Sequence, residues 1–162
     1  MMNEEYLISK IGSITIGVHC KDVTNVYSQQ LKITKLFYLQ DIYMGITTIK
    51  NSIVHIVDFS KRILIDSQAS AKGSTERNII MFHTSLEKNI AILVDHIIGL
   101  KPISSNSIVK SSSNFNNKQK NIHLLFPYVA KMSDGKLIYL MDVTYVDFID
   151  VIEDNDGELD WL

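Results

Sequence analysis

The sequence predicts a mainly β protein built from two similar small barrels, with short helices and a C-terminal helix. Two observations support this fold class. Ile and Val are abundant and occur in short runs, and these β-branched side chains favour strands. In addition, a turn, an apolar run and an aspartate occur twice, once ending at Asp58 and once ending at Asp142. Two copies of a β unit are too few for a solenoid, so we expect paired barrels.

The clearest element is segment 45–59, with the sequence GITTIKNSIVHIVDF. Two β-branched runs, 46–49 and 53–57, flank a polar turn at 50–52, and this order is typical of a hairpin. The second run is apolar on both faces, which indicates a strand buried between two layers. Asp58 follows directly, where a short acidic side chain can cap a helical turn.

A second copy of this pattern lies at residues 130–142. A weaker echo relates residues 15–18 to residues 89–92, and Val23 and Ile97 each follow at the same distance. The simplest account is two similar β units, one in each half of the chain.

The remaining elements follow from periodicity and from flanking residues. Two short segments, 22–27 and 95–100, follow strands and open with an acid, so we expect each to begin with a helical turn. Apolar residues that can share one face predict a longer helix at 143–152. Strands are predicted at residues 6–10, 13–19, 44–49, 53–57, 78–83, 89–94, part of 122–132, and 136–141.

We expect residues 1–152 to form a single domain of two β subdomains, and the acidic tail 153–162 to be disordered. Segment 67–76 has the composition of a flexible connection between the halves. Segment 104–120 is rich in Ser, Asn and Lys, although Ile108 and Val109 can still pair as a short strand. The terminal Trp161-Leu162 is compatible with a docking motif and with an untethered end.

Composition excludes several classes of protein. A formal net charge of −2 and a pI near 6.2 give no electrostatic footprint for nucleic acid. No apolar run approaches the ~18 residues of a membrane span, and the first residues carry acids where a signal peptide has bases, so we expect a soluble cytoplasmic protein without membrane insertion. The single cysteine, Cys20, fits a reducing compartment, and we expect a small buried apolar side chain rather than a reactive thiol.

The candidate catalytic residues are the repeated Asp58 and Asp142, which form a carboxylate dyad if they meet, as in an aspartic-type hydrolase. That chemistry relies on Thr or Ser and then Gly after each aspartate, whereas Phe-Ser and Val-Thr follow here. We therefore expect two capping acids. The histidines are dispersed, the glycines are isolated, and no nucleophile elbow occurs, so the sequence predicts no metal, no cofactor and no enzyme.

Segment 45–59 resembles, without a gap, the G-V-x-N-L-R-G-x-I-V-P-V-V-D-L signature of the CheW family of chemotaxis coupling proteins. Segment 90–97 is similar to that family's second signature, V-G-L-x-V-D-x-V. Residues 6–8 and 134–142 also fall in family order. The resemblance covers about residues 5–150.

The resemblance implies two five-stranded β barrels with an apolar groove between them. It also implies a non-enzymatic adaptor that links the cytoplasmic tips of chemoreceptors to a CheA-type histidine kinase, through the CheW-like regulatory domain of that kinase. For the apolar positions of the implied site, packing in the core is the competing interpretation. By motif position, partner binding falls on Val23, Asn25, Gly45, Lys50, Ile97 and Leu100.

Four positions depart from the family pattern: Asn25, Lys50, Asn51 and His55 stand where Glu, Arg, Gly and Pro are usual. The first two are often a charge pair in the family, and a lysine cannot reproduce the bidentate contact of an arginine. We therefore expect binding to the kinase to be mainly apolar. A divergent CheW-like scaffold in a chemosensory pathway other than chemotaxis is an alternative, as is the hydrolase with Asp58 and Asp142.

Overall fold

The computed structural model describes residues 3–28, 32–34, 43–59, 78–83, 89–111 and 125–143. Most of these residues belong to strands, which confirms the mainly β prediction. The elements are β1 (Asn3–Ile11), β2 (Ile14–His19), η1 (Cys20–Asp22), β3 (Val23–Ser28), β4 (Tyr43–Ile49), β5 (Ser52–Val57), β6 (Asn78–His83), β7 (Asn89–Val94), β8 (His96–Ser104), η2 (Ser105–Ser107), β9 (Ile108–Lys110), β10 (Tyr128–Lys131) and β11 (Leu137–Leu140).

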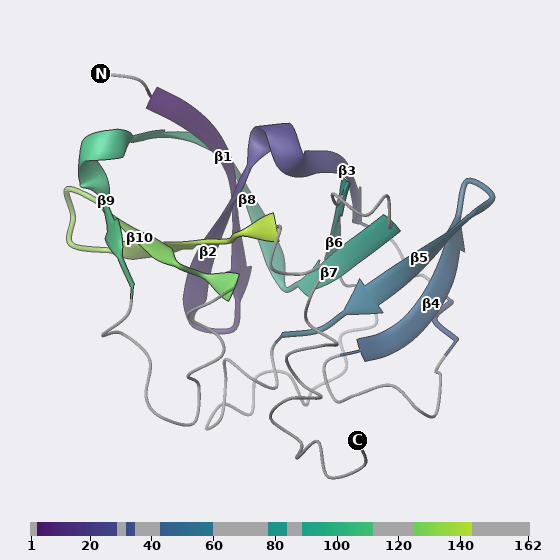
Figure 1. Ribbon diagram of the computed structural model, residues 1–162. Coiled ribbons are helices and arrows are strands. Elements are labelled where there is room, and N and C mark those ends of the chain that lie inside the picture. The colour runs from purple at the N-terminus through teal and green to yellow at the C-terminus, as the bar shows by residue number, and fades with distance from the viewer. Residues whose placement is uncertain are drawn as a thin grey trace, which may run out of the picture.

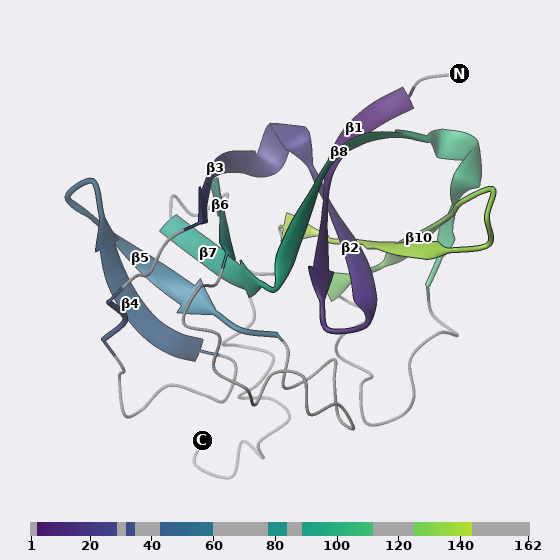
Figure 2. The ribbon, with the colours of Figure 1, turned by 180° about the vertical axis from the view of Figure 1, so that it is seen from behind.

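The strands form two sheets that lie side by side (Figure 1). Sheet A has six strands in the order β8-β1-β2-β11-β10-β9, and sheet B has five in the order β3-β6-β7-β5-β4. Figure 2 shows β1 and β8 on the side of sheet A that faces sheet B. The predicted number of five strands therefore holds for sheet B, whereas sheet A contains one strand more.

Sheet A is strongly curled, because its two edge strands are neighbours in the sequence. Strands β8 and β9 lie at opposite edges, yet only the three-residue helix η2 joins them. A flat six-stranded sheet separates its edges by about 24 Å, whereas the connection from Ser104 to Ile108 spans at most about 14 Å. The sheet must therefore bend until its edges approach each other, as in a small barrel.

The chain crosses from one sheet to the other twice, and this corrects the predicted division into halves. After β2 it passes through η1 into β3 of sheet B, and after β7 it passes through Asp95 into β8 of sheet A. Sheet B is thus built from one continuous stretch, and sheet A from the two flanking stretches. Segment 67–76 connects β5 to β6 within sheet B instead of separating two units, although its own residues lie outside the described part.

The repeat found in the sequence nevertheless has a structural counterpart in the two parallel strand pairs. In sheet A, Tyr139 of β11 pairs with Ile16 of β2, and in sheet B, His55 of β5 pairs with Ile90 of β7. Tyr139 and His55 are equivalent positions of the stronger repeat, and Ile16 and Ile90 are equivalent positions of the weaker echo. Each copy of the apolar run therefore pairs, in the same register, with a copy of the weaker echo. The similarity extends across both sheets and does not separate the N-terminal half from the C-terminal half.

Two predicted helical turns are wrong. Segments 22–27 and 95–100 fall mainly in β3 and β8, where half-buried and exposed residues alternate with the period of a strand. Asp22 ends η1 and does not open a helix. The carboxylate of Asp95 accepts a hydrogen bond from the backbone N–H of Gly12 in a different turn.

The described residues test only some of the predictions for the hairpin, the loops and the C-terminal end. Ile108 and Val109 pair with β10, so the short strand predicted within segment 104–120 is confirmed. The hairpin predicted at 45–59 is confirmed as β4 and β5. The helix predicted at 143–152 lies outside the described residues from residue 144 on, and so does the whole of the tail 153–162.

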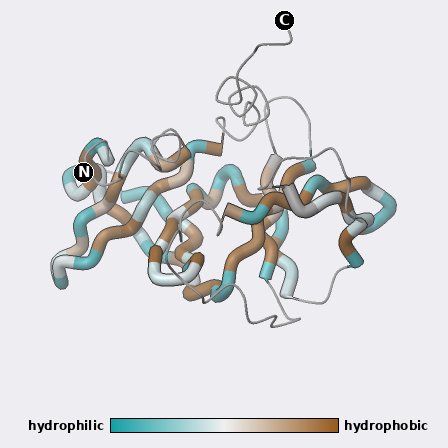
Figure 3. Tube along the Cα trace, turned by 90° about the horizontal axis from the view of Figure 1, so that it is seen from below, coloured by the Kyte–Doolittle hydropathy of each residue, from teal (hydrophilic) through white to brown (hydrophobic). Residues whose placement is uncertain are grey.

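The buried apolar side chains of the described residues form three clusters, one of which joins the two sheets. The largest contains side chains from both sheets, among them Leu7 and Val18 of sheet A and Ile80 and Phe82 of sheet B. A second cluster fills the inside of sheet A, and a third fills the inside of sheet B. Hydrophobic and hydrophilic residues alternate along many of the strands, as Figure 3 shows. Where the two sheets meet, the described residues thus form a packed core, and the apolar groove expected between the barrels stays a prediction.

Candidate partner-binding surface

Four of the six predicted partner-binding residues lie on the two strands that follow the sheet crossings. Val23 and Asn25 belong to β3, and Ile97 and Leu100 belong to β8. Both strands carry a β-bulge near their start, since Thr24 in β3 and Ile98 in β8 have no partner in the register. Because a bulge twists and bends a strand, it redirects the side chains on either side of it.

Val23 and Ile97 are half-buried and pack against the same cluster, the one that joins the two sheets. The structure therefore brings these two predicted residues to a common core. Their packing favours the structural interpretation, in which they fix the strands that carry other residues to the surface.

Gly45 is buried and has a φ of 139°, a backbone conformation that residues other than glycine rarely adopt. It follows a bulge in β4, since the register moves from Tyr43 opposite Val57 to Gly45 opposite Ile56. Gly99, which follows the bulge in β8, has a similar φ of 143°. The role of Gly45 in this structure is thus to shape the backbone of the hairpin.

Asn25 and Lys50 occupy the positions of the family's charge pair, but no hydrogen bond or ion pair joins them in this structure. The half-buried Asn25 donates a hydrogen bond from Nδ2 to the hydroxyl oxygen of Tyr27, at 2.9 Å. Lys50 lies at the exposed tip of the β4–β5 hairpin, where it and Asn51 have φ values of 49° and 65°. Two left-handed residues in a two-residue loop are typical of a type I′ turn. Among the described residues, Lys50 makes no ion pair.

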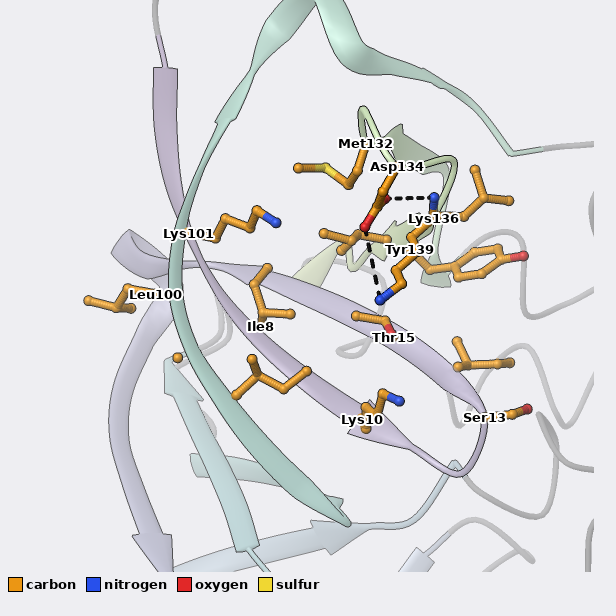
Figure 4. A pocket seen from close by; sticks show the side chains of 15 residues that line it. Ile8, Lys10, Ser13, Thr15, Leu100, Lys101, Met132, Asp134, Lys136 and Tyr139 are labelled. Carbon is orange, nitrogen blue, oxygen red and sulfur yellow. Dashed lines mark hydrogen bonds and ion pairs between the residues drawn. The ribbon is translucent and has the colours of Figure 1, made fainter.

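Leu100 is the residue of the predicted set with the most exposed apolar side chain. Its exposed fraction is 64%, and that of Ile98, two positions earlier on β8, is 60%. Figure 4 shows the Leu100 side chain on the side of β8 that faces away from Ile8 and Tyr139. Two large apolar side chains on an edge strand are unusual for a surface without a partner. Ile98 is not among the predicted residues, because the family's motif positions fall on its neighbours Ile97 and Leu100.

Comparison with known families agrees with this fold. The profile of the CheW-like domain family matches residues 5–146. The chain belongs to the CheW-like domain family. The family resemblance expected from segments 45–59 and 90–97 is therefore confirmed. No curated protein matches the chain in sequence.

A crystal structure described as the scaffolding protein TtCheW from Thermoanaerobacter tengcongensis is similar to this chain in fold. The TM-score is 0.74, the sequence identity is 21%, and the match covers 90% of this chain and 92% of that chain. At this identity, the similarity extends to the CheW-like fold alone.

The alternative catalytic pair has no support in this CheW-like domain. Asp58 follows β5 of sheet B and is buried, whereas Asp142 follows β11 of sheet A and is exposed. Two carboxylates that share a proton need a common environment and close contact. Asp58 and Asp142 instead follow strands of different sheets. Within the described part of the chain, no group of three or more His, Cys, Asp or Glu residues is placed to hold a metal ion.

The thiol of Cys20, in η1 of the CheW-like domain, is half-buried. Burial, and to a smaller extent the negative charge of Glu5, raise the pKa of this thiol above its ordinary value. Because the thiolate is the nucleophile, a raised pKa makes the side chain less reactive at neutral pH.

In the described residues, no helix is long and apolar enough to span a membrane.

Proposed function

We propose that this CheW-like protein is a cytoplasmic, non-enzymatic adaptor in chemotaxis signalling. It binds the regulatory domain of a CheA-type histidine kinase and the cytoplasmic tips of chemoreceptors. Membership of the CheW-like domain family supports the adaptor role. The observation that carries the choice of surface is the exposed apolar pair Ile98 and Leu100 on the edge strand β8.

The pair on β8 is suited to supply most of the binding energy for the kinase. Apolar side chains that become fully buried at the centre of an interface account for most of its affinity, whereas exposed charges at the rim mainly set the association rate and the register. Lys50 is such an exposed charge, and Asn25 is hydrogen-bonded within its own strand. Binding to the kinase therefore depends more on Leu100 than on Asn25 and Lys50, the two positions that form a charge pair in the family.

Titration calorimetry with the regulatory domain of the kinase from the same organism tests this proposal. We expect Leu100→Ala to weaken binding by more than about 1 kcal/mol, and Lys50→Ala to cost less. Since Leu100 is exposed, its truncation leaves no cavity, and the folded state should be unaffected. Val109→Ala, at an exposed apolar position on β9, is the matched control and should bind like the wild type.

The opposite order of effects contradicts the proposed surface. If Lys50→Ala abolishes binding in a folded protein while Leu100→Ala leaves it intact, the kinase does not bind through the apolar pair. Circular dichroism and thermal melting of each variant separate lost binding from lost folding. Co-sedimentation with membranes that contain the receptors tests the second partner in the same set of variants.

A further inference from the structure

A groove of about 850 Å³ opens on sheet A, where β1, β2 and β8 meet the β10–β11 hairpin (Figure 4). This volume lies within the range of about 300–1,000 Å³ that is usual for ligand sites. The buried Ile8 and Ile138 form part of its lining, together with the half-buried Ile14, Met132 and Leu137. The groove thus offers an apolar floor that is open to solvent.

The charged residues at the groove are mainly basic. Lys10, Lys101 and Lys136 are exposed and come from three different strands or turns, and Asp134 is the one acid among the described lining residues. The Asp134 carboxylate lies 3.9 Å from the Lys136 Nζ and accepts a hydrogen bond from the Lys136 backbone N–H. Neither Lys10 nor Lys101 pairs with a carboxylate of a described residue. A chain with a net charge of −2 therefore concentrates positive charge at this groove.

The ligand that fits such a groove is acidic and carries a large apolar side chain. Segment 153–162, EDNDGELDWL, has this composition: it contains five acids and no base, and the acids lead to Trp161 and Leu162. Its structure lies outside the described residues. Charge attraction favours its acids near Lys10 and Lys101, and burial of an indole on an apolar floor is favourable, with a cation–π contribution where a lysine lies over the ring.

We propose that the groove on sheet A binds segment 153–162 of this chain, with its acids against Lys10 and Lys101 and with Trp161 on the apolar floor. Ile98 and Leu100 also line this groove, so it adjoins the proposed kinase surface, but the inference does not depend on that proposal. It rests on the charge complementarity between the groove and segment 153–162, which combines five acids with an aromatic side chain and has no base.

Tryptophan fluorescence of the full chain tests this contact directly, because Trp161 is the only tryptophan. We expect its emission to be blue-shifted relative to a synthetic peptide of residues 153–162, and its quenching by acrylamide to be slower. The variant with both Lys10→Glu and Lys101→Glu should shift the emission to that of the peptide. High salt should act in the same direction, because it screens exposed charges. Lys110→Glu, an exposed lysine on β9 outside the groove, is the matched control and should change nothing.

Two results overturn the proposal. In the first, the wild-type emission equals that of the free peptide, so that Trp161 is exposed to water. In the second, the emission is blue-shifted but the double lysine variant keeps the shift, so that Trp161 is buried elsewhere. A shift that is sensitive to the lysines and disappears on dilution supports the contact as one between two copies of the chain. Circular dichroism confirms that the exposed lysine variants remain folded.

Discussion

Asp95 is the residue that ties the second sheet crossing to both sheets. Its Oδ2 accepts a hydrogen bond of 2.6 Å from the backbone N–H of Gly12, and its own N–H donates to the carbonyl of Lys10, at 2.8 Å. Its carbonyl accepts from Nδ2 of Asn78 in sheet B, at 3.1 Å. Gly12, with a φ of 60°, forms the turn between β1 and β2. The side chain of Asp95 therefore holds the β1–β2 hairpin, while its backbone contacts both sheets.

Replacing Asp95 by alanine should lower the free energy of unfolding by about 1–3 kcal/mol, since the part-buried N–H of Gly12 loses a charged acceptor. Asp95→Asn retains a neutral oxygen acceptor and should cost less. Urea unfolding followed by circular dichroism measures both variants against the wild type. Equal stability of all three proteins would mean that the hydrogen bond to Gly12 contributes nothing net.

At the residue scale, the motif indicated candidate partner-binding residues but not the direction of their side chains. Leu100 is largely exposed, while Val23 and Ile97 pack on the core, and all three are simply apolar in the sequence. Partner binding by Gly45 stays a prediction, and its positive φ shows that it also has a backbone role. The alternation on β8 that brings Ile98 to the surface depends on the bulge after Ile97, and no local sequence pattern specified this bulge.

At the scale of single elements, the parallel pairing of β2 with β11 depends on Gly17. A Cβ at this position would lie 3.0 Å from Cδ2 of Leu140 and 3.2 Å from Cγ2 of Ile138, closer than ordinary contact. Both neighbours belong to the buried cluster inside sheet A. The absence of a side chain at Gly17 thus lets β11 carry two large apolar residues against β2.

Gly17→Val should destabilise the protein by about 1–3 kcal/mol, as overpacking of a filled core usually does. Gly17→Ala should cost less, because the side-chain ends of Leu140 and Ile138 need to move by only a few tenths of an ångström. Thermal unfolding of the two variants provides the comparison. A valine variant as stable as the wild type would show that the core of sheet A has room beside β2.

Elements were predictable where their partners are local. The β4–β5 hairpin is formed by residues that are close in the sequence, and its polar turn at Lys50 and Asn51 was visible in the composition. Strands β3 and β8 pair with β6 and β1, which are far away along the chain. Because an acid opened each of these segments, local signals favoured a helical turn. Tertiary pairing overrode that preference, as it commonly does for short segments.

At the scale of the whole molecule, the repeat was visible in the sequence but the way it is assembled was not. A parallel pair cannot be closed by a tight turn, so each repeated strand has to find a partner far away in the chain. The parallel pairs β2–β11 and β5–β7 both join strands from the two halves of the sequence. A repeat that places one copy in each half is compatible with two separate units and with this interleaved pair, and only the strand order decides between them.

The interleaved sheets lead to the prediction that both unfold in one step. The chain crosses between the sheets twice, and the largest buried cluster contains Leu7 and Val18 of sheet A beside Ile80 and Phe82 of sheet B. Ile80→Val removes one methylene from this shared cluster and should cost about 0.5–1.5 kcal/mol. In a cooperative unit, that loss lowers the free energy of opening for every slowly exchanging amide.

Hydrogen exchange measured by mass spectrometry distinguishes one unit from two. We expect Ile80→Val to reduce protection equally in β1 and β2 of sheet A and in β6 and β7 of sheet B. Ile56→Val, in the cluster confined to sheet B, serves as the companion variant and should also act on both sheets. If either variant accelerates exchange in sheet B while sheet A keeps its full protection, the sheets open independently. The shared cluster would then be a contact between two units that are stable on their own.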